Sequence, residues 1–192
     1  MKSSVNSDSS RNTKRSRNHG FSLVELLITV SIGMVLMALA TPLVQNAMRN
    51  YTLNSAASNV ARLTQLARYT AIRQGAMACT LLEGNFFGVD ADCDGALAAN
   101  DLRYVLPSGV SPSKDVPPMD SMNFTAEPEL VDDDALVISF NARGNKIAAP
   151  DDPTIETTVR VIFLEGWGNT SAITVSGAGR ARSWRYTGET WF

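Results

Sequence analysis

Four aspartates between residues 90 and 101 have a spacing that could hold a metal ion. Asp90, Asp92, Asp94 and Asp101 occupy positions 1, 3, 5 and 12 of a twelve-residue loop, and Gly95 occupies position 6. This is the ligand spacing of an EF-hand, whose hard oxygen atoms and tight turn suit calcium. However, position 12 is normally the longer glutamate, and a strand instead of a helix is expected before this loop. The pattern leaves two alternatives open, a calcium site and a solvated acidic turn.

Three arginines near the C-terminal end could contact phosphate groups. Arg180, Arg182 and Arg185 alternate with small and aromatic residues. In an extended segment Arg180 and Arg182 share one face and Arg185 lies on the other, while Trp184 and Tyr186 could stack on single-stranded bases. With two to three phosphate contacts, binding to DNA should be weak and should fall quickly as salt rises. The alternative is an edge strand whose charges discourage edge-to-edge aggregation.

The sequence does not predict catalysis. Carboxylates cluster at residues 132–134 and 151–152, but adjacent acids in loops are usually solvated, and no paired nucleophile and base accompany them. The single histidine, His19, precedes a long apolar run, so the remainder of the chain lacks the commonest general base and metal ligand. We therefore expect that the protein is not an enzyme.

The apolar run from Phe21 to Ala40 contains one charged residue, Glu25. Its 20 residues, at about 1.5 Å per residue, match the roughly 30 Å of a bilayer's hydrocarbon core and predict a membrane-spanning helix. Residues 1–20 carry five basic residues and one acidic residue, which places this leader in the cytoplasm. In a secretory signal the small cleavage residue follows the apolar region, whereas Gly20 precedes it, so cleavage here would retain the helix.

The segment from Gly20 to Glu25 resembles the cleavage and methylation site of the type IV pilin and pseudopilin superfamily. The resemblance implies that a prepilin peptidase cuts between Gly20 and Phe21 and that Phe21 becomes an N-methylated first residue. It also implies that Glu25 pairs with the N-terminal amine of a neighbouring subunit, a cationic partner that makes a carboxylate tolerable in a membrane. The alternative is a plain signal anchor with an isolated glutamate.

A second, amphipathic half of the helix is expected over residues 43–75. Pro42 should bend the helix near the membrane exit, and Gly75 is a natural residue to end it. Arg62 and Arg73 project from the face opposite the apolar one. The apolar face is predicted to contain Leu53, Ala57, Val60, Leu63, Ala67 and Ala71.

Residues 76–192 are expected to form a β-rich domain. A hairpin is predicted from Ala76–Leu82 and Phe86–Val89, and residues 107–134 should be irregular, with one short strand near residues 122–124. The fold class is α+β, with a long N-terminal helix packed against an antiparallel sheet. Further strands are expected at Leu102–Leu106, Leu136–Phe140, Lys146–Ala149, Thr157–Leu164 and Ser171–Val175.

The two cysteines and the charge distribution bound the chemistry of this domain. Cys79 and Cys93 lie in the part expected in the periplasm, where a disulfide can persist, and both a bridge and free thiols remain open. Removing the leader takes away five of 17 basic and one of 19 acidic residues, which leaves 12 basic against 18 acidic residues. A uniformly nucleic-acid-binding surface is therefore not expected.

Three later segments narrow the resemblance. Residues 66–75, residues 138–144 and the segment Gly179 to Arg182 are similar to the FimT/GspH group of minor pilins and pseudopilins. This implies a pilin-like fold and a structural and assembly subunit of a type IV pilus or of a type II secretion pseudopilus. The implied partners are other pilin subunits, a prepilin peptidase and, before assembly, the inner membrane.

The same resemblance implies a second function. In FimT-like proteins a GRxR motif of the kind found here at residues 179–182 is associated with DNA capture during natural transformation.

The expected order along the chain is a cleaved leader over 1–20, a transmembrane or filament-core helix over 21–42, an amphipathic helix over 43–75 and a periplasmic domain over 76–192. Calcium is the one cofactor that the residues suggest, and the sequence does not choose between a pilus and a pseudopilus.

Overall fold

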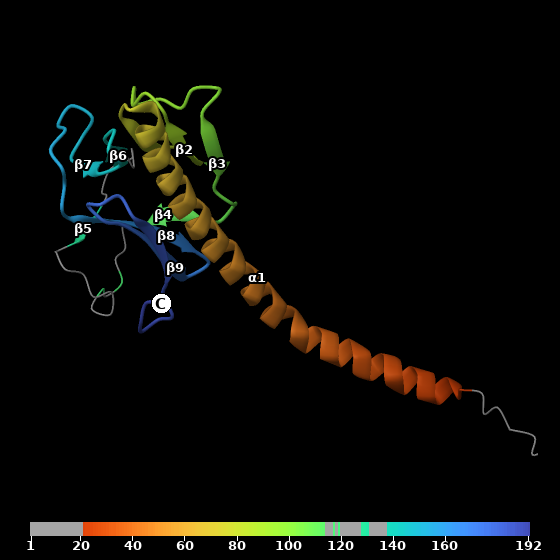
Figure 1. The fold of residues 1–192 in the computed structure, drawn as a ribbon. Coiled ribbons are helices and arrows are strands. Elements are labelled where there is room, and N and C mark those ends of the chain that lie inside the picture. The colour runs from red at the N-terminus through yellow and green to blue at the C-terminus, as the bar shows by residue number, and fades with distance from the viewer. Residues whose placement is uncertain (1–20, 114–116, 118, 120–127, 131–137) are drawn as a thin grey trace, which may run out of the picture. The chain divides into compact units, whose positions relative to one another are not determined.

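The computed structural model describes residues 21–113, 117, 119, 128–130 and 138–192 (Figure 1). The leader with Gly20, the strand considered near residues 122–124 and the acidic run at 132–134 lie outside the described residues. The chain divides into two compact units, residues 1–43 and residues 44–192, and each is described by itself.

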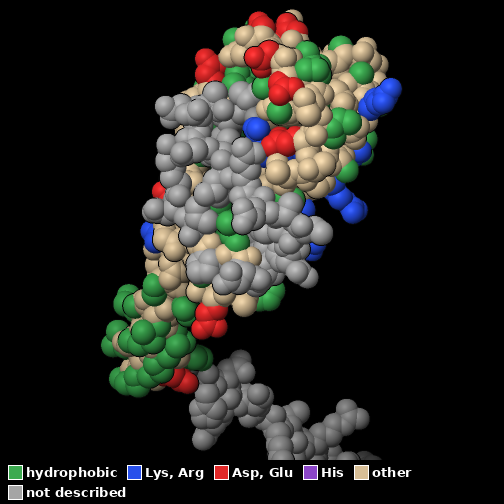
Figure 2. Space-filling model, turned by 90° about the vertical axis from the view of Figure 1, so that its left-hand side faces the viewer, with side chains coloured by type: hydrophobic (Ala, Val, Ile, Leu, Met, Phe, Trp, Pro, Cys, Tyr) green, Lys and Arg blue, Asp and Glu red, His purple; other side chains and the backbone are tan. Residues whose placement is uncertain are grey.

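The long helix α1 (Leu23–Gln74) begins in the first unit and ends in the second. The large hydrophobic side chains of its N-terminal part are exposed, and Figure 2 shows them gathered on the face in view. Within the described residues, α1 is the one helix that is long and apolar enough to cross a membrane, judged by length and composition. The chain is helical on both sides of Pro42, and the bend expected there stays a prediction.

The C-terminal part of α1 is amphipathic, as its sequence predicted. All six residues of the predicted apolar face are buried, together with Ala56 and Thr64. Arg62 and Arg73 are exposed. Gly75 follows the last helical residue with a φ of 64°, a left-handed conformation that glycine adopts without a steric cost.

The first sheet has five strands. They are β1 (Ala78–Glu83), β2 (Phe86–Asp90), β3 (Leu102–Val105), β6 (Ile138–Phe140) and β7 (Lys146–Ile147). Their order in the sheet is β3-β2-β1-β6-β7, and every pair is antiparallel. The predicted hairpin is confirmed by the pairing of β1 with β2.

The second sheet contains β4 (Ser111–Ser113), β8 (Val159–Gly166), β9 (Asn169–Val175) and β10 (Ala181–Arg185) in the order β10-β9-β8-β4. A further short strand, β5 (Pro128–Leu130), pairs with β8 in parallel. Two sheets therefore stand where a single one was expected. The strands β4 and β5 were not among the predicted strands, and each contains only three residues, which is too short for a period-2 pattern. The arginine segment, for which an edge strand was one of two alternatives, forms the edge strand β10.

One hydrophobic core joins α1 to both sheets within the second unit (Figure 1). Phe87 of β2, Phe140 of β6, Leu164 of β8 and Ile173 of β9 pack there against the buried face of α1. A second, smaller cluster contains Val161, Phe163, Ala172 and Trp191. The α+β class, with a long N-terminal helix packed against antiparallel sheets, is thus confirmed.

Candidate functional site

The start of α1 places Glu25 in the first helical turn. The Leu26 N–H donates to the carbonyl oxygen of Ser22 at 3.1 Å, so Ser22 is the N-cap residue of α1. Serine followed three residues later by glutamate is the spacing of a capping box, and a carboxylate is favoured near the positive end of the helix dipole. The side chains of Phe21 and Glu25 are both exposed and therefore accessible to a partner.

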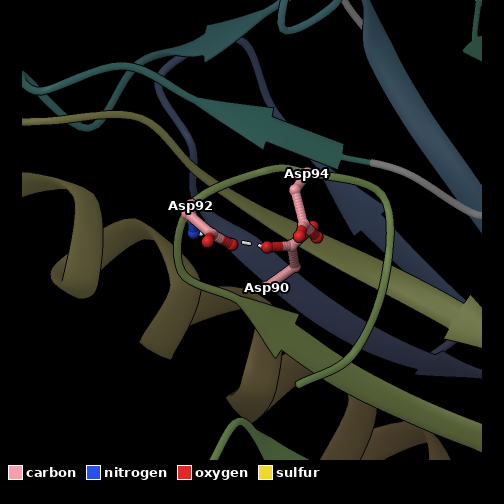
Figure 3. Close-up of side chains that lie close together, drawn as sticks. All are labelled: Asp90, Asp92 and Asp94. Carbon is pink, nitrogen blue, oxygen red and sulfur yellow. Dashed lines mark hydrogen bonds between the residues drawn. The ribbon is translucent and has the colours of Figure 1, made fainter.

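The acidic loop is organised around the carboxylate of Asp90, whose residue is only 1% exposed. Its Oδ1 accepts the N–H of Cys93 at 2.8 Å and the N–H of Asp92 at 3.3 Å. Its Oδ2 accepts the N–H of Gly95 at 3.0 Å. Figure 3 shows the side chains of Asp90, Asp92 and Asp94 lying close together. One carboxylate oxygen from each lies within 4.8 Å of the others.

Three of the four predicted calcium ligands therefore come together. Asp101 is not part of that group, and its Oδ2 accepts the N–H of Ala98 at 2.8 Å. Asp92 and Asp94 are exposed, whereas both oxygens of Asp90 already accept backbone hydrogen bonds. The loop can thus hold its shape through Asp90, and calcium at this position stays a prediction.

A disulfide attaches the same loop to the first sheet. Cys79 of β1 is bonded to Cys93, with 5.3 Å between the two Cα atoms. Cys79 lies opposite Asp90 in the β1–β2 register, so the bridge and the Asp90 carboxylate act on the same end of the hairpin. Cys93 has a φ of 55°, a conformation that a non-glycine residue rarely adopts.

The three C-terminal arginines lie at an edge of the second sheet. Arg182 is opposite Thr174 in the register and Arg185 is opposite Ser171, so these two arginines project from opposite faces of β10. On the face of Arg185, Ser171 donates a hydrogen bond to Asn54 of α1. Arg185 lines a pocket of about 440 Å³ on this face, together with Asn54.

Arg180 precedes β10 instead of belonging to it. It follows Gly179, whose N–H donates to the carbonyl oxygen of Ser176 at 2.7 Å and closes a turn. The side chains of Arg180, Arg182 and Arg185 are all exposed. Within the described part of the chain, these side chains form no ion pair.

The aromatic residues of this segment have other contacts than those expected. The Trp184 Nε1–H donates to Thr174 Oγ1 at 2.9 Å, and the guanidinium carbon of Arg182 lies 4.1 Å from the centroid of the Trp184 ring. The Tyr186 ring packs against Trp191, with 4.9 Å between the ring centroids. Both side chains are half-buried, so the open stacking surface expected for bases is not what the structure shows.

A contact between two turns was not anticipated from the sequence. The turn at Gly144 lies directly against the turn at Gly179, because a Cβ atom on Gly179 would collide with the Gly144 carbonyl oxygen. The Nε–H of Arg68 on α1 donates to that same carbonyl at 2.9 Å. Arg143 precedes Gly144 and Arg180 follows Gly179, so an exposed arginine adjoins each of the two contacting glycines. The resemblance had singled out the three segments that contain these residues, but nothing in the sequence indicated that the segments contact one another.

The described acidic pair at residues 151–152 does not suggest acid–base catalysis. The Thr154 side-chain hydroxyl, and then its backbone N–H, donate to the carboxylate of Asp152 and lower its pKa below the usual value. A general acid or base works best with a pKa near the working pH. Asp152 is instead held ionised at neutral pH.

Comparison with solved structures finds the type IV minor pilin FimU of Pseudomonas aeruginosa in two crystal forms. Each is 18% identical to this chain, with a TM-score of 0.44. The matches cover 68% of this chain and 86% and 91% of the FimU chains. No curated protein matches the chain.

The family model of the prokaryotic N-terminal methylation motif matches residues 15–41. This range contains the Gly20–Phe21 bond, Glu25 and most of the apolar run, the features on which the resemblance was based. The chain therefore carries the prokaryotic N-terminal methylation motif in its N-terminal part.

Proposed function

We propose that the chain is a minor pilin, a structural and non-enzymatic subunit of a type IV pilus. The match of residues 15–41 to the N-terminal methylation motif carries this proposal. The exposed apolar side chains of residues 21–43 support it, because so large an apolar surface must be covered by lipid or by other helices. In a subunit that is stored in a membrane and later packed into a filament, this surface is covered first by lipid and then by the helices of other subunits.

The N-terminal residues have defined roles in this proposal. A prepilin peptidase cuts the Gly20–Phe21 bond, and the new amine of Phe21 is methylated. The carboxylate of Glu25 then pairs with the N-terminal amine of a neighbouring subunit, which gives the charge a partner in the apolar filament core. The exposed position of Glu25 on the first turn of α1 supports such a contact between subunits.

The same proposal fixes the topology. The leader stays in the cytoplasm, the N-terminal part of α1 crosses the inner membrane, and residues 76–192 lie in the periplasm. The disulfide between Cys79 and Cys93 supports a periplasmic position, because disulfides persist in oxidising compartments.

The test is incorporation of the full chain into filaments sheared from its own cells. We expect the wild-type chain in the filament fraction, and we expect Glu25→Ala to be processed normally but strongly depleted from that fraction. Thr29→Ala is the matched control, because it changes an exposed polar side chain one turn later without removing a charge. Wild-type protein that is processed but never enters sheared filaments would contradict the pilus proposal and favour a type II secretion pseudopilus.

We further propose that the subunit binds DNA, for which the C-terminal arginines are the specific observation. Arg180, Arg182 and Arg185 are exposed and free of ion pairs within the described residues, so their charges can face phosphate groups. The stacking of Arg182 on Trp184 holds one guanidinium in place at the surface of the sheet. Arg182 and Arg185 lie on opposite faces, so Arg180 and Arg182 are the pair we expect to contact one duplex.

A gel-shift experiment with the full chain in detergent tests DNA binding. We expect a shift at low salt that the double variant Arg180→Ala and Arg182→Ala abolishes. Arg73→Ala is the control, because it removes an exposed arginine near the end of α1. A wild-type chain that gives no shift at low salt would end the DNA proposal and leave the minor-pilin proposal standing.

A further inference from the structure

We propose that the phosphate-binding surface extends from β10 onto the neighbouring turn, with Arg143 as a further contact residue and Arg68 as the residue that positions it. This inference rests on the proposed DNA binding and deepens it. The backbone contact between Gly144 and Gly179 carries the inference, because each glycine is next in sequence to an exposed arginine. Arg143 and Arg180 are therefore held as neighbours although 37 residues separate them along the chain.

The contact between the two turns is close enough to require glycine at position 179, and the backbone conformation favours glycine at both positions. Gly144 and Gly179 both have a φ of 76°, a region that other residues rarely adopt. A Cβ atom on Gly179 would collide with the Gly144 carbonyl oxygen, and a Cβ atom on Gly144 would collide with the Ile72 side chain. The position of one turn relative to the other is thus set by backbone against backbone at Gly179 and the Gly144 carbonyl.

The side chain of Arg68 joins these turns to α1. Its Nε–H donates to the Gly144 carbonyl at 2.9 Å, and its Cδ and Nε lie 3.0 and 3.1 Å from the place that a Cβ of Gly179 would take. One helical turn earlier, Gln65 Nε2 donates to the carbonyl oxygen of Ala181 at 3.4 Å. Gln65 and Arg68 of α1 therefore fix the start of β10 and the Gly144 turn in position relative to each other.

The charges support an anionic ligand. Arg143, Arg180 and Arg182 are exposed, and in the described part of the structure none of them pairs with a carboxylate. The backbone N–H of Arg143 donates to Asn141 Oδ1 at 3.0 Å, so its position does not depend on its own side chain. Three exposed arginines, two beside adjoining turns and one at the start of β10, match the repeating phosphates of a nucleic acid better than an isolated anion.

The experiment measures binding of the full chain in detergent to a double-stranded DNA fragment over a series of salt concentrations. Arg143→Ala should weaken binding. It should also make the negative slope of log K, the association constant, against log salt concentration shallower by about one, as expected for the loss of one phosphate contact. Arg143→Gln should also weaken binding and change the slope in the same way, because it removes the charge while keeping a longer polar side chain than alanine. Arg62→Ala is the matched control, because Arg62 is exposed on α1 but outside this contact.

Arg68→Lys tests the positioning role, because it keeps the charge and removes the Nε–H donor. We expect it to weaken binding, and we expect Arg143→Ala to cost less in this background than in the wild type. A purely electrostatic or purely structural role of Arg68 would leave the effect of Arg143→Ala the same in both backgrounds, and would overturn the positioning role.

The outcomes separate this inference from the DNA proposal. If the wild type binds DNA and the loss of Arg180 and Arg182 abolishes binding, but both Arg143 variants keep the wild-type slope, the extended surface is wrong and DNA binding stands. If the wild type does not bind, both are wrong. A melting temperature equal to that of the wild type in each Arg143 variant assigns a loss of binding to the missing contact and not to unfolding.

Discussion

The Nε–H of Arg68 donates a hydrogen bond to the carbonyl oxygen of Gly144 at 2.9 Å, and this bond joins α1 to a turn 76 residues further along the chain. The same guanidinium packs beside Gly179. The first glycine of the GRxR segment is thus explained by its contact with the Gly144 turn, and the arginine that follows it is placed beside a second basic turn.

Gly179→Ala is expected to destabilise the protein by about 3 kcal/mol, because it adds a collision with the Gly144 carbonyl to the cost of a left-handed backbone. Urea unfolding of the full chain in detergent, followed by circular dichroism, measures the change. Gly188→Ala is the matched control. Gly188 also has a positive φ, but a Cβ there would meet nothing within 4 Å, so about 1 kcal/mol is expected. Equal losses in the two variants would contradict a close contact between the turns.

Removal of the disulfide by a Cys79→Ser and Cys93→Ser double variant is expected to lower the free energy of unfolding by about 3 kcal/mol. The bridge closes a loop with a sequence separation of 14, and the value follows from the entropy of such a loop in the unfolded chain. Reductant should lower the melting temperature of the wild type toward that of the variant and leave the variant unchanged. A wild type insensitive to reductant would count against a disulfide that stabilises the acidic loop.

Asp90→Ala is expected to cost about 2 to 4 kcal/mol, because it leaves backbone N–H groups of residues 92, 93 and 95 without their acceptor. Asp92→Ala removes an exposed carboxylate of the same loop and should change stability by no more than about 0.5 kcal/mol. Thermal unfolding of both variants gives the comparison. A loop that tolerates both substitutions equally would not be organised by Asp90.

A calcium ion held by Asp90, Asp92 and Asp94 would raise the melting temperature of the wild type, because a ligand that binds only the folded state stabilises it. The double variant Asp92→Asn and Asp94→Asn should lose that increase while keeping the hydrogen bonds of Asp90. Magnesium is the control, because it demands a smaller, octahedral site. An unchanged melting temperature on addition of calcium would discard the metal and leave the solvated turn.

The helical part of the fold could be predicted because its signal is local and periodic. The apolar residues from Leu53 to Ala71 recur every three or four positions, and all six predicted positions are buried. The β1–β2 hairpin was equally clear, because two apolar runs flank a short turn at Gly84. The division of the strands into two sheets could not be predicted, because strand pairing between distant segments leaves no local pattern.

The candidate site was predictable only in part, for the same reason. Asp90, Asp92 and Asp94 come together because they are adjacent in one loop, whereas Asp101 turns away to accept the N–H of Ala98. The alternation of Arg182 and Arg185 followed from strand geometry. The neighbourhood of Arg68, Arg143 and Arg180 depends on contacts between α1 and two separate turns, so it emerged only from the three-dimensional structure.

Cleavage at the Gly20–Phe21 bond is the most direct test that the chain is a pilin-like subunit. The full chain is produced with and without a prepilin peptidase, and the intact mass of the purified protein is measured. We expect the peptidase to remove residues 1–20 and the product to carry one added methyl group on Phe21. Gly20→Val should block the cut, because it replaces the small residue at the cleavage bond. A wild-type chain that keeps its full mass in the presence of an active peptidase would contradict the account.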